Sequence, residues 1–175
     1  MSVDKIGSVD VPLCVDLDGT LIRTDSLVEA TTLFMKQHFL MVVLFPFWLL
    51  GGRARFKEEI AARTELDVAF LPYEDTVLET IREARAVGRH VILCTGANRR
   101  YAQAVADHLG LFVDIMASDE TTNLSGKVKQ RVLMKHFGEG GYDYIGNDTK
   151  DLPAFRYDRK SYLVSPSRAL LRAQG

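Results

Sequence analysis

Short apolar runs alternate with longer amphipathic stretches along most of the chain. The apolar runs predict buried parallel strands at residues 11–15, 89–94, 111–116, 141–145 and 161–164. Helical patterns lie between the later runs, at residues 73–87, 98–109 and 126–137. This alternation predicts an α/β fold built on a doubly wound parallel sheet.

The segment after the first strand interrupts this alternation, because it is helical. A helix over residues 26–37 is predicted to begin at Ser26, with Glu29 at the spacing of a capping box. A second helix, over residues 53–63, carries basic residues on its first turn. Positive charge at a helix start opposes the helix dipole. We therefore expect these residues to serve an anionic substrate or lipid headgroups, or to form a solvated face.

Twelve consecutive apolar residues separate the two helices, starting at Phe39 and ending at Leu50. The run is too short to span a bilayer, which needs about 20 apolar residues. The helical segment as a whole predicts a cap inserted after the first strand, above the carboxyl edge of the sheet. The predicted domains are a core of residues 1–24 and 88–175 and a helical cap of residues 25–87.

Two carboxylates follow the first strand, at the edge where open α/β sheets bind ligands. Because side chains alternate along an extended chain, Asp16 and Asp18 emerge on the same side, with Leu17 turned into the core. Like charges about 4 Å apart repel by roughly 4 kcal/mol at an effective dielectric near 20. A hard cation such as Mg²⁺ relieves this repulsion and takes further ligands from a phosphate. A helix-capping Asp before a turn would explain Asp18, but it leaves Asp16 unexplained.

The sequence Asp16-Leu17-Asp18-Gly19-Thr20 resembles the first motif of the haloacid dehalogenase-like (HAD) superfamily. The resemblance implies that Asp16 is a nucleophile that takes up a phosphoryl group. It also implies that Asp18 is the general acid and base for the leaving oxygen and the hydrolytic water. We therefore expect a Mg²⁺-dependent HAD-type phosphatase that hydrolyses phosphomonoesters through an aspartyl-phosphate on Asp16. A dehalogenase is less expected, because it needs neither the metal nor the second Asp, and a phosphomutase stays open.

A transferred phosphoryl group also needs positive charge and hydrogen-bond donors around it. Thr95 and the amides of Gly96 and Ala97 end the second strand and match the second HAD motif, so we expect them to bind a phosphate oxygen. The third motif is a lysine, for which Lys127 and Lys129 are both candidates. We favour Lys129, because similar sequences carry the pattern Gly-x-x-Lys-x-x-x-Leu.

The fourth HAD motif is acidic and completes the metal site. Family members carry Gly-Asp-x-x-x-Asp, whereas here an asparagine occupies the first acidic place. The predicted metal ligands are Asp16, Asp18, Asn147, Asp148 and Asp151. Either the Asn147 carbonyl oxygen ligates the metal or Asp148 replaces it, and Asp151 orients a ligand water and pairs with the lysine. The lost charge keeps open a non-catalytic regulatory or binding domain that retains the fold.

The composition and net charge of the chain bear on its binding partners, on the state of its cysteines and on its location in the cell. The net charge is −1, with 22 basic and 23 acidic residues, so there is no electrostatic basis for binding nucleic acid. Cys14 and Cys94 each lie inside an apolar run and are expected to be reduced core residues. The first ten residues are polar and do not resemble a signal peptide, so we expect a cytoplasmic protein.

Further segments resemble the HAD domain that is fused to UbiA-type membrane prenyltransferases. They are residues 16–27, the apolar run, 106–112 and 123–126. In that arrangement the phosphatase precedes transmembrane helices. The resemblance implies a prenyltransferase partner, a location at the inner face of the membrane, and either a complete protein or an excised domain. The substrate would be a phosphorylated small molecule or a lipid-linked one, such as a polyprenyl-phosphoryl phosphopentose.

The apolar run has two interpretations. It dips into the membrane interface or contacts a polyprenyl chain, or it forms a buried cap helix, kinked at Pro46, that packs on the sheet or on a second copy. A short basic helix is predicted after residue 164. Candidates for binding substrate charge are Arg23, Arg53, Arg55, Arg99 and Arg100.

Overall fold

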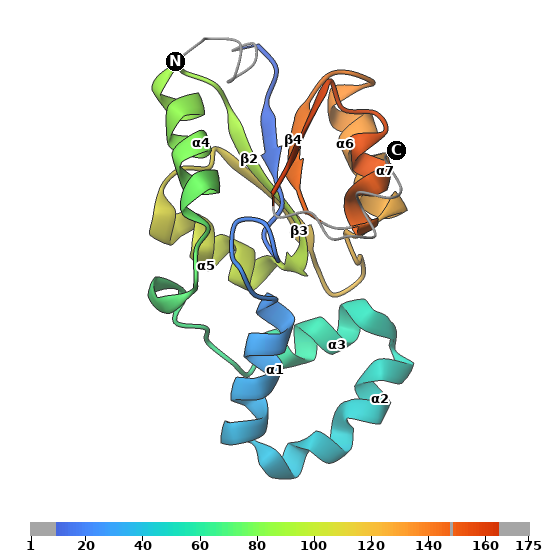
Figure 1. The fold of residues 1–175 in the computed structure, drawn as a ribbon. Helices are drawn as coiled ribbons and strands as arrows, with labels where there is room; N and C mark the ends of the chain where they lie inside the picture. The colour runs from blue at the N-terminus through green and yellow to red at the C-terminus, as the bar shows by residue number, and fades with distance from the viewer. Residues whose placement is uncertain (1–9, 148, 165–175) are drawn as a thin grey trace.

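The computed structural model describes residues 10–147 and 149–164. Its centre is a five-stranded sheet in which every pairing is parallel, with the strand order β3-β2-β1-β4-β5 (Figure 1). The predicted doubly wound parallel sheet is confirmed, and β1 is its central strand. The strands are β1 (Leu13–Val15), β2 (Val91–Asn98), β3 (Asp114–Ser118), β4 (Asp143–Gly146) and β5 (Lys160–Leu163).

Side chains of the strands alternate between two hydrophobic clusters on opposite faces of the sheet. Leu13, Val15 and Leu93 belong to one cluster, whereas Cys14 and Cys94 belong to the other. Both cysteines are buried free thiols, as expected from their apolar surroundings in the sequence. Because both faces are covered, the strands need no polar face, which explains their uninterrupted apolar runs.

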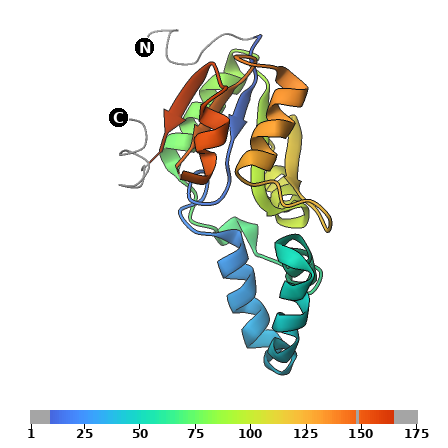
Figure 2. The same ribbon diagram turned by 90° about the vertical axis from the view of Figure 1, so that its right-hand side faces the viewer.

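Two helices cover each face of the sheet (Figures 1 and 2). One pair is α4 (Asp75–Ala86) and α5 (Arg99–Leu109), and the other is α6 (Lys127–Phe137) and α7 (Leu152–Phe155). The amphipathic patterns of α4, α5 and α6 correspond to the three helices predicted between the strands. The sheet is therefore sandwiched in the manner of a doubly wound fold.

The cap lies beyond the carboxyl ends of the strands (Figures 1 and 2). It consists of α1 (Ser26–Gln37), the 3₁₀-helix η2 (Phe39–Leu44), α2 (Phe45–Leu50) and α3 (Gly52–Ala61). Helix α1 has its predicted bounds, but the predicted capping box was wrong. The carboxylate of Asp25 caps the helix instead, accepting from the amide of Leu27 at 2.9 Å. The Glu29 carboxylate accepts from the Thr24 hydroxyl at 2.7 Å.

Aromatic rings form the interior of the cap. Phe34, Phe45, Trp48 and Phe56 contact one another with ring centroids 5.2–5.7 Å apart. Pro46 lies in the first turn of α2, where its missing N–H costs no hydrogen bond. The apolar run is therefore not one kinked helix; it divides at Phe45 into η2 and α2.

Helix α4 packs against the sheet and not within the cap. Its buried residues Val77, Ile81 and Ala84 belong to the same cluster as the core strands. The segments that enter and leave the cap lie side by side, since the Arg23 amide donates to the Pro72 carbonyl oxygen at 2.8 Å. We propose that the cap ends before α4 and not at residue 87. An amphipathic pattern shows that a helix buries one face, but not against which layer.

None of the helices in the described part of the chain is long and apolar enough to cross a membrane. The short basic helix predicted after residue 164 and the candidate ligand Asp148 lie outside the described residues.

Candidate active site

Strand β1 delivers Asp16 and Asp18 to the carboxyl edge of the sheet. The Asp16 amide donates to the Ile145 carbonyl oxygen at 3.0 Å and so extends the pairing with β4. Asp18 Oδ1 accepts from the Ser26 amide at 2.8 Å, so the start of α1 fixes this carboxylate. Gly19 has a φ of 73°, and a Cβ there would collide with the side-chain amide of Asn147. Only glycine suits this turn.

Lys129 is buried beside the first of these carboxylates. Its Nζ donates to Asp16 Oδ1 at 2.9 Å, to Asp151 Oδ1 at 3.0 Å and to the Tyr144 hydroxyl at 2.6 Å. The Tyr144 hydroxyl also donates to Asp151 Oδ1 at 3.0 Å. Lys127, by contrast, is exposed on α6. The structure therefore brings Lys129 to the predicted nucleophile, and not Lys127.

These contacts shift the protonation equilibria of the site. Burial raises the pKa of Asp16 to about 7 against the opposing ammonium of Lys129, and the carboxylates of Asp151 and Asp18 add to the rise. Burial also raises the pKa of Asp18. Burial opposes a charged Lys129, but the carboxylates of Asp16 and Asp151 outweigh it and raise the lysine's pKa. The site thus keeps a permanent cation, and its carboxylates gain from further positive charge.

The segment after β4 supplies the other predicted residues. Asp151 shares its Oδ1 between Lys129 and Tyr144, and its Oδ2 accepts from the Asn147 amide at 3.4 Å. A Cβ on Gly146 would lie 2.7 Å from Asp151 Oδ2, so the close approach of this carboxylate needs glycine. Asp151 therefore acts on the lysine and the loop backbone.

A cavity of about 360 Å³ opens at this edge of the sheet. Residues from three strand ends, from α6 and from the cap line it together. The cavity thus collects most of the predicted site. The predicted residues among its lining are Asp16, Asp18, Gly96, Lys129, Asn147 and Asp151.

Among the predicted site residues, those expected to bind phosphate differ most from the prediction in conformation and burial. Strand β2 does not end at Thr95; it continues to Asn98, which pairs with Ser118 in β3. Thr95 is fully buried, and its hydroxyl accepts the Ala97 amide at 3.0 Å. The Ala97 amide is therefore engaged within the strand, while Gly96 lines the catalytic cavity.

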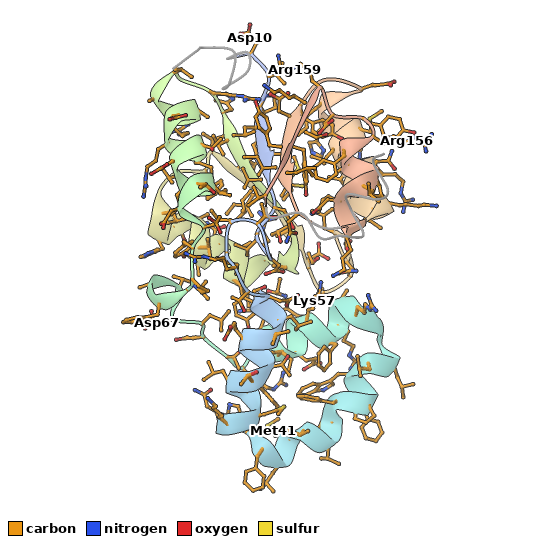
Figure 3. The ribbon with its side chains drawn as sticks, viewed as in Figure 1. Asp10, Met41, Lys57, Asp67, Arg156 and Arg159 are labelled. Atoms are coloured by element: carbon orange, nitrogen blue, oxygen red, sulfur yellow. The ribbon has the colours of Figure 1, made fainter. Side chains whose placement is uncertain are left out.

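The cap contributes Lys57, which points from α3 to the junction with the core (Figure 3). Its Nζ donates to the Gly96 carbonyl oxygen at 2.5 Å and to Asn123 Oδ1 at 2.8 Å. Burial lowers the pKa of Lys57. A second cavity of about 320 Å³ lies beside the first, and both are lined by Asp18 and Lys57. Arg53 and Phe56 of the cap also line this second cavity.

Comparison with known proteins agrees with this architecture. The model of the family described as haloacid dehalogenase-like hydrolase matches residues 13–156. The chain belongs to this HAD family. An uncharacterized protein from Sinorhizobium fredii is 35% identical over 155 residues, which cover 88% of the chain but 30% of that relative. The chain thus spans less than a third of the length of the curated relative it matches.

Solved structures share the HAD fold at low sequence identity. A substrate-bound phosphoserine phosphatase superposes with a TM-score of 0.66 at 12% identity, over 95% of this chain and 91% of that one. A Bordetella pertussis protein of unknown function gives a TM-score of 0.68 at 16% identity, over 93% of both chains. A HAD-family hydrolase from Salmonella enterica serovar Typhi gives 0.65 at 10%, over 93% of this chain and 66% of that one. Identities this low show the fold alone.

The donor set at the edge of the sheet fits Mg²⁺. Within residues 10–147 and 149–164, no three His, Cys, Asp or Glu side chains are grouped to hold a metal by themselves. Asp16 and Asp18 supply two carboxylates, and Asn147 lines the same cavity. Asn147 Oδ1 is buried and accepts no hydrogen bond from the described residues, which is expected of an oxygen that awaits a cation. Two carboxylates, an amide oxygen, waters and a phosphate make a hard-cation site.

Two residues of the HAD site have no sequence signal of their own. Tyr144 lies inside an apolar strand and is read as core, although its hydroxyl contacts Lys129 and Asp151. Lys57 belongs to the basic first turn of α3, and that unusual position was the one indication of its role. The contacts of Lys57 join segments far apart in the sequence, and those of Tyr144 join a strand to two separate helices.

Proposed function

We propose that the chain is a Mg²⁺-dependent phosphomonoester hydrolase that works through an aspartyl-phosphate on Asp16. The observation that supports this best is the buried contact of Lys129 Nζ with Asp16 Oδ1 at 2.9 Å, beside Asp18 and in a cavity roofed by the cap. A permanent cation beside a carboxylate at a strand end suits the approach of a dianionic phosphate.

The two aspartates divide the chemistry between them. An Asp16 oxygen attacks phosphorus, and the bond from phosphorus to the leaving oxygen breaks. Asp18, whose pKa is raised by burial, gives a proton to that oxygen. Its carboxylate then takes a proton from water, which attacks the aspartyl-phosphate and releases phosphate and Asp16. The Ser26 amide holds Asp18 in place through both steps.

Other residues position the lysine and neutralise the charge of the phosphoryl group. Lys129 balances the negative charge of the phosphoryl group, and Asp151 and Tyr144 hold the lysine toward Asp16. Of the residues at the end of β2, Gly96 lines the cavity and is proposed to contact the phosphate oxygens. Mg²⁺, bound by Asp16, Asp18 and Asn147, would supply positive charge to the same oxygens.

The lining of the second cavity supports an amphiphilic leaving group. Leu27, Leu49 and Phe56 give it an apolar side, and Arg53 and Lys57 give it positive charge. A lipid-linked sugar phosphate has both characters, and so we propose it as the substrate class. The greater length of the curated relative is compatible with a further domain, such as the proposed prenyltransferase, in longer proteins of this type.

Removal of the metal tests the catalytic proposal directly. We expect hydrolysis of p-nitrophenyl phosphate to fall at least about 100-fold in EDTA and to return when Mg²⁺ is added in excess. The reason is that the repulsion between phosphate and the paired aspartates is then uncompensated. The measurement is the initial rate at fixed pH, with circular dichroism to show that the fold persists. Equal rates with and without EDTA would contradict a metal-dependent site.

The alternative is a non-catalytic HAD domain, and Asn147 is the observation that favours it. Restoring the family's carboxylate by Asn147→Asp should lower the Mg²⁺ concentration for half-maximal activity by about fivefold or more, because a ligand charge is added. Asn123→Asp is the matched control, since it adds the same charge beside Lys57 and not at the ligand position. An equal effect of both variants would refute ligation at residue 147. If neither the wild type nor Asn147→Asp shows turnover, the non-catalytic alternative holds.

A further inference from the structure

The apolar run divides in three dimensions into a packed side and an exposed side. Phe45 and Trp48 pack on the aromatic interior of the cap. In contrast, η2 has no buried residue, although all six of its residues are apolar. We define the cap tip as the large apolar side chains of η2 and α2 that face solvent and line neither of the two cavities of the site. They are Phe39, Leu40, Val43, Phe47 and Leu50.

The exposure of the cap tip is extreme for apolar side chains. Phe39 is 70% exposed and Leu50 is 85% exposed. Five such side chains on two adjoining helices form an apolar surface, and not the scattered single residues that are common on proteins. A surface of this kind, held on a packed aromatic base, is built to be covered by something apolar.

The cap tip projects away from the catalytic centre. The segment between α1 and α2, which contains η2, forms the end of the cap farthest from the sheet, and α2 runs back from it toward α3 (Figures 1 and 2). Met41 of η2 lies at this far end, whereas Lys57 lies at the junction with the core (Figure 3). An extended surface can therefore contact the cap tip without entering the cavity that Asp16 lines.

The charge of the surrounding segment indicates what covers the tip. Residues 30–57 contain no Asp or Glu, yet they include Lys36, Arg53, Arg55 and Lys57. Lys36 at the end of α1 and Arg53 and Arg55 at the start of α3 are exposed. Arg55 Nε lies 3.7 Å from Glu59 Oε1, so Lys36 and Arg53 carry most of the excess positive charge. Exposed apolar side chains beside such an excess match an anionic lipid surface, where headgroup phosphates lie above hydrocarbon.

We propose that the cap tip inserts shallowly into an anionic bilayer surface, with Lys36 and Arg53 on lipid headgroup phosphates. A second copy of the chain fits less well, because a self-complementary contact would bring Lys36 and Arg53 toward their own copies, and residues 30–57 offer no acidic side chain to pair with them. The inference rests on exposed residues and not on the phosphatase chemistry. Vesicle binding and phosphate release can therefore fail independently.

Flotation with lipid vesicles tests the proposal. The wild type should float with phosphatidylcholine vesicles that contain phosphatidylglycerol, bind pure phosphatidylcholine more weakly, and lose affinity as salt is raised. The triple variant Phe39→Ser, Phe47→Ser, Leu50→Ser should bind the anionic vesicles at least about tenfold more weakly, because it loses three insertable side chains. Phe45 and Trp48 are unsuitable targets, since they hold the cap together.

The matched control removes exposed apolar side chains from elsewhere on the surface. Phe70, in the 3₁₀-helix η3 (Val68–Phe70), and Val87, at the end of α4, are both exposed. The double variant Phe70→Ser, Val87→Ser should bind vesicles like the wild type. Circular dichroism checks each variant, and if the triple variant does not fold, Leu50→Ser alone should still weaken binding about threefold.

Four results would overturn the proposal. One is a wild type that does not bind anionic vesicles, and another is a cap-tip variant that binds them like the control. The third is a wild-type dimer in light scattering that the triple variant abolishes, without vesicle binding by either protein. That last result would assign the cap tip to a second copy of the chain. Binding to neutral and anionic vesicles alike, at any salt concentration, would contradict the role of the basic residues.

Discussion

Replacing Asp16 by Asn should lower kcat for p-nitrophenyl phosphate at least about 1,000-fold, because the nucleophile is lost while shape and volume are kept. Lys129 retains its contacts with Asp151 and Tyr144 in this variant, so the site should not collapse. The readout is the steady-state rate with Mg²⁺ present, together with thermal unfolding. Asp107→Asn on the exposed side of α5 is the control and should leave the rate unchanged.

The paired variant Asp18→Asn separates the two proposed roles. p-Nitrophenolate is a good leaving group and needs little protonation, whereas hydrolysis of the aspartyl-phosphate needs a base. Asp18→Asn should therefore release about one equivalent of p-nitrophenolate per protein molecule and then stop. Asp16→Asn should give no such burst. A burst in Asp16→Asn, or multiple turnovers at the wild-type rate in either variant, would refute the assignment.

The sequence predicted those parts of the molecule that depend on local chemistry. Asp16 and Asp18 follow a short apolar strand, and period-two alternation places both side chains at the sheet edge. The resemblance of residues 126–133 to a pattern in similar sequences favoured Lys129 over Lys127, and the structure places Lys129 beside Asp16. In each case the necessary information lies within about ten residues.

The pattern of apolar and polar residues did not predict contacts between different elements of the fold. Nothing in an apolar strand distinguishes Tyr144, whose hydroxyl contacts Lys129, from a tyrosine that only fills the core. The second strand was expected to end before Thr95, but β2 continues to Asn98, which pairs with Ser118 beyond an irregularity in the pairing with β3. The apolar run is a further example. Its composition does not reveal that Trp48 packs inside the cap, whereas Leu50 faces solvent.

Replacing Arg89 by Met should lower the free energy of unfolding by about 3–5 kcal/mol. Arg89 and Asp143 form a fully buried ion pair at the end of the sheet opposite the catalytic cavity, with Nη2 and Oδ2 2.5 Å apart. The guanidinium also donates to the Val11 carbonyl oxygen at 2.6 Å and so anchors the chain before β1. Without Arg89, the buried carboxylate and this carbonyl oxygen lose donors that water cannot replace. Urea titration followed by circular dichroism measures the loss.

Arg159 provides a matched comparison, because it binds the same carboxylate from a more exposed position. Its Nε and Nη2 lie 2.8 and 2.7 Å from the Asp143 oxygens, and its side chain is 35% exposed. Arg159→Met should therefore cost only about 1 kcal/mol. The double variant Arg89→Met, Asp143→Leu should be more stable than Arg89→Met alone, since it also removes the buried carboxylate, which Arg159 alone would otherwise have to balance. Equal destabilisation by the two arginine variants would show that burial does not control the strength of this ion pair.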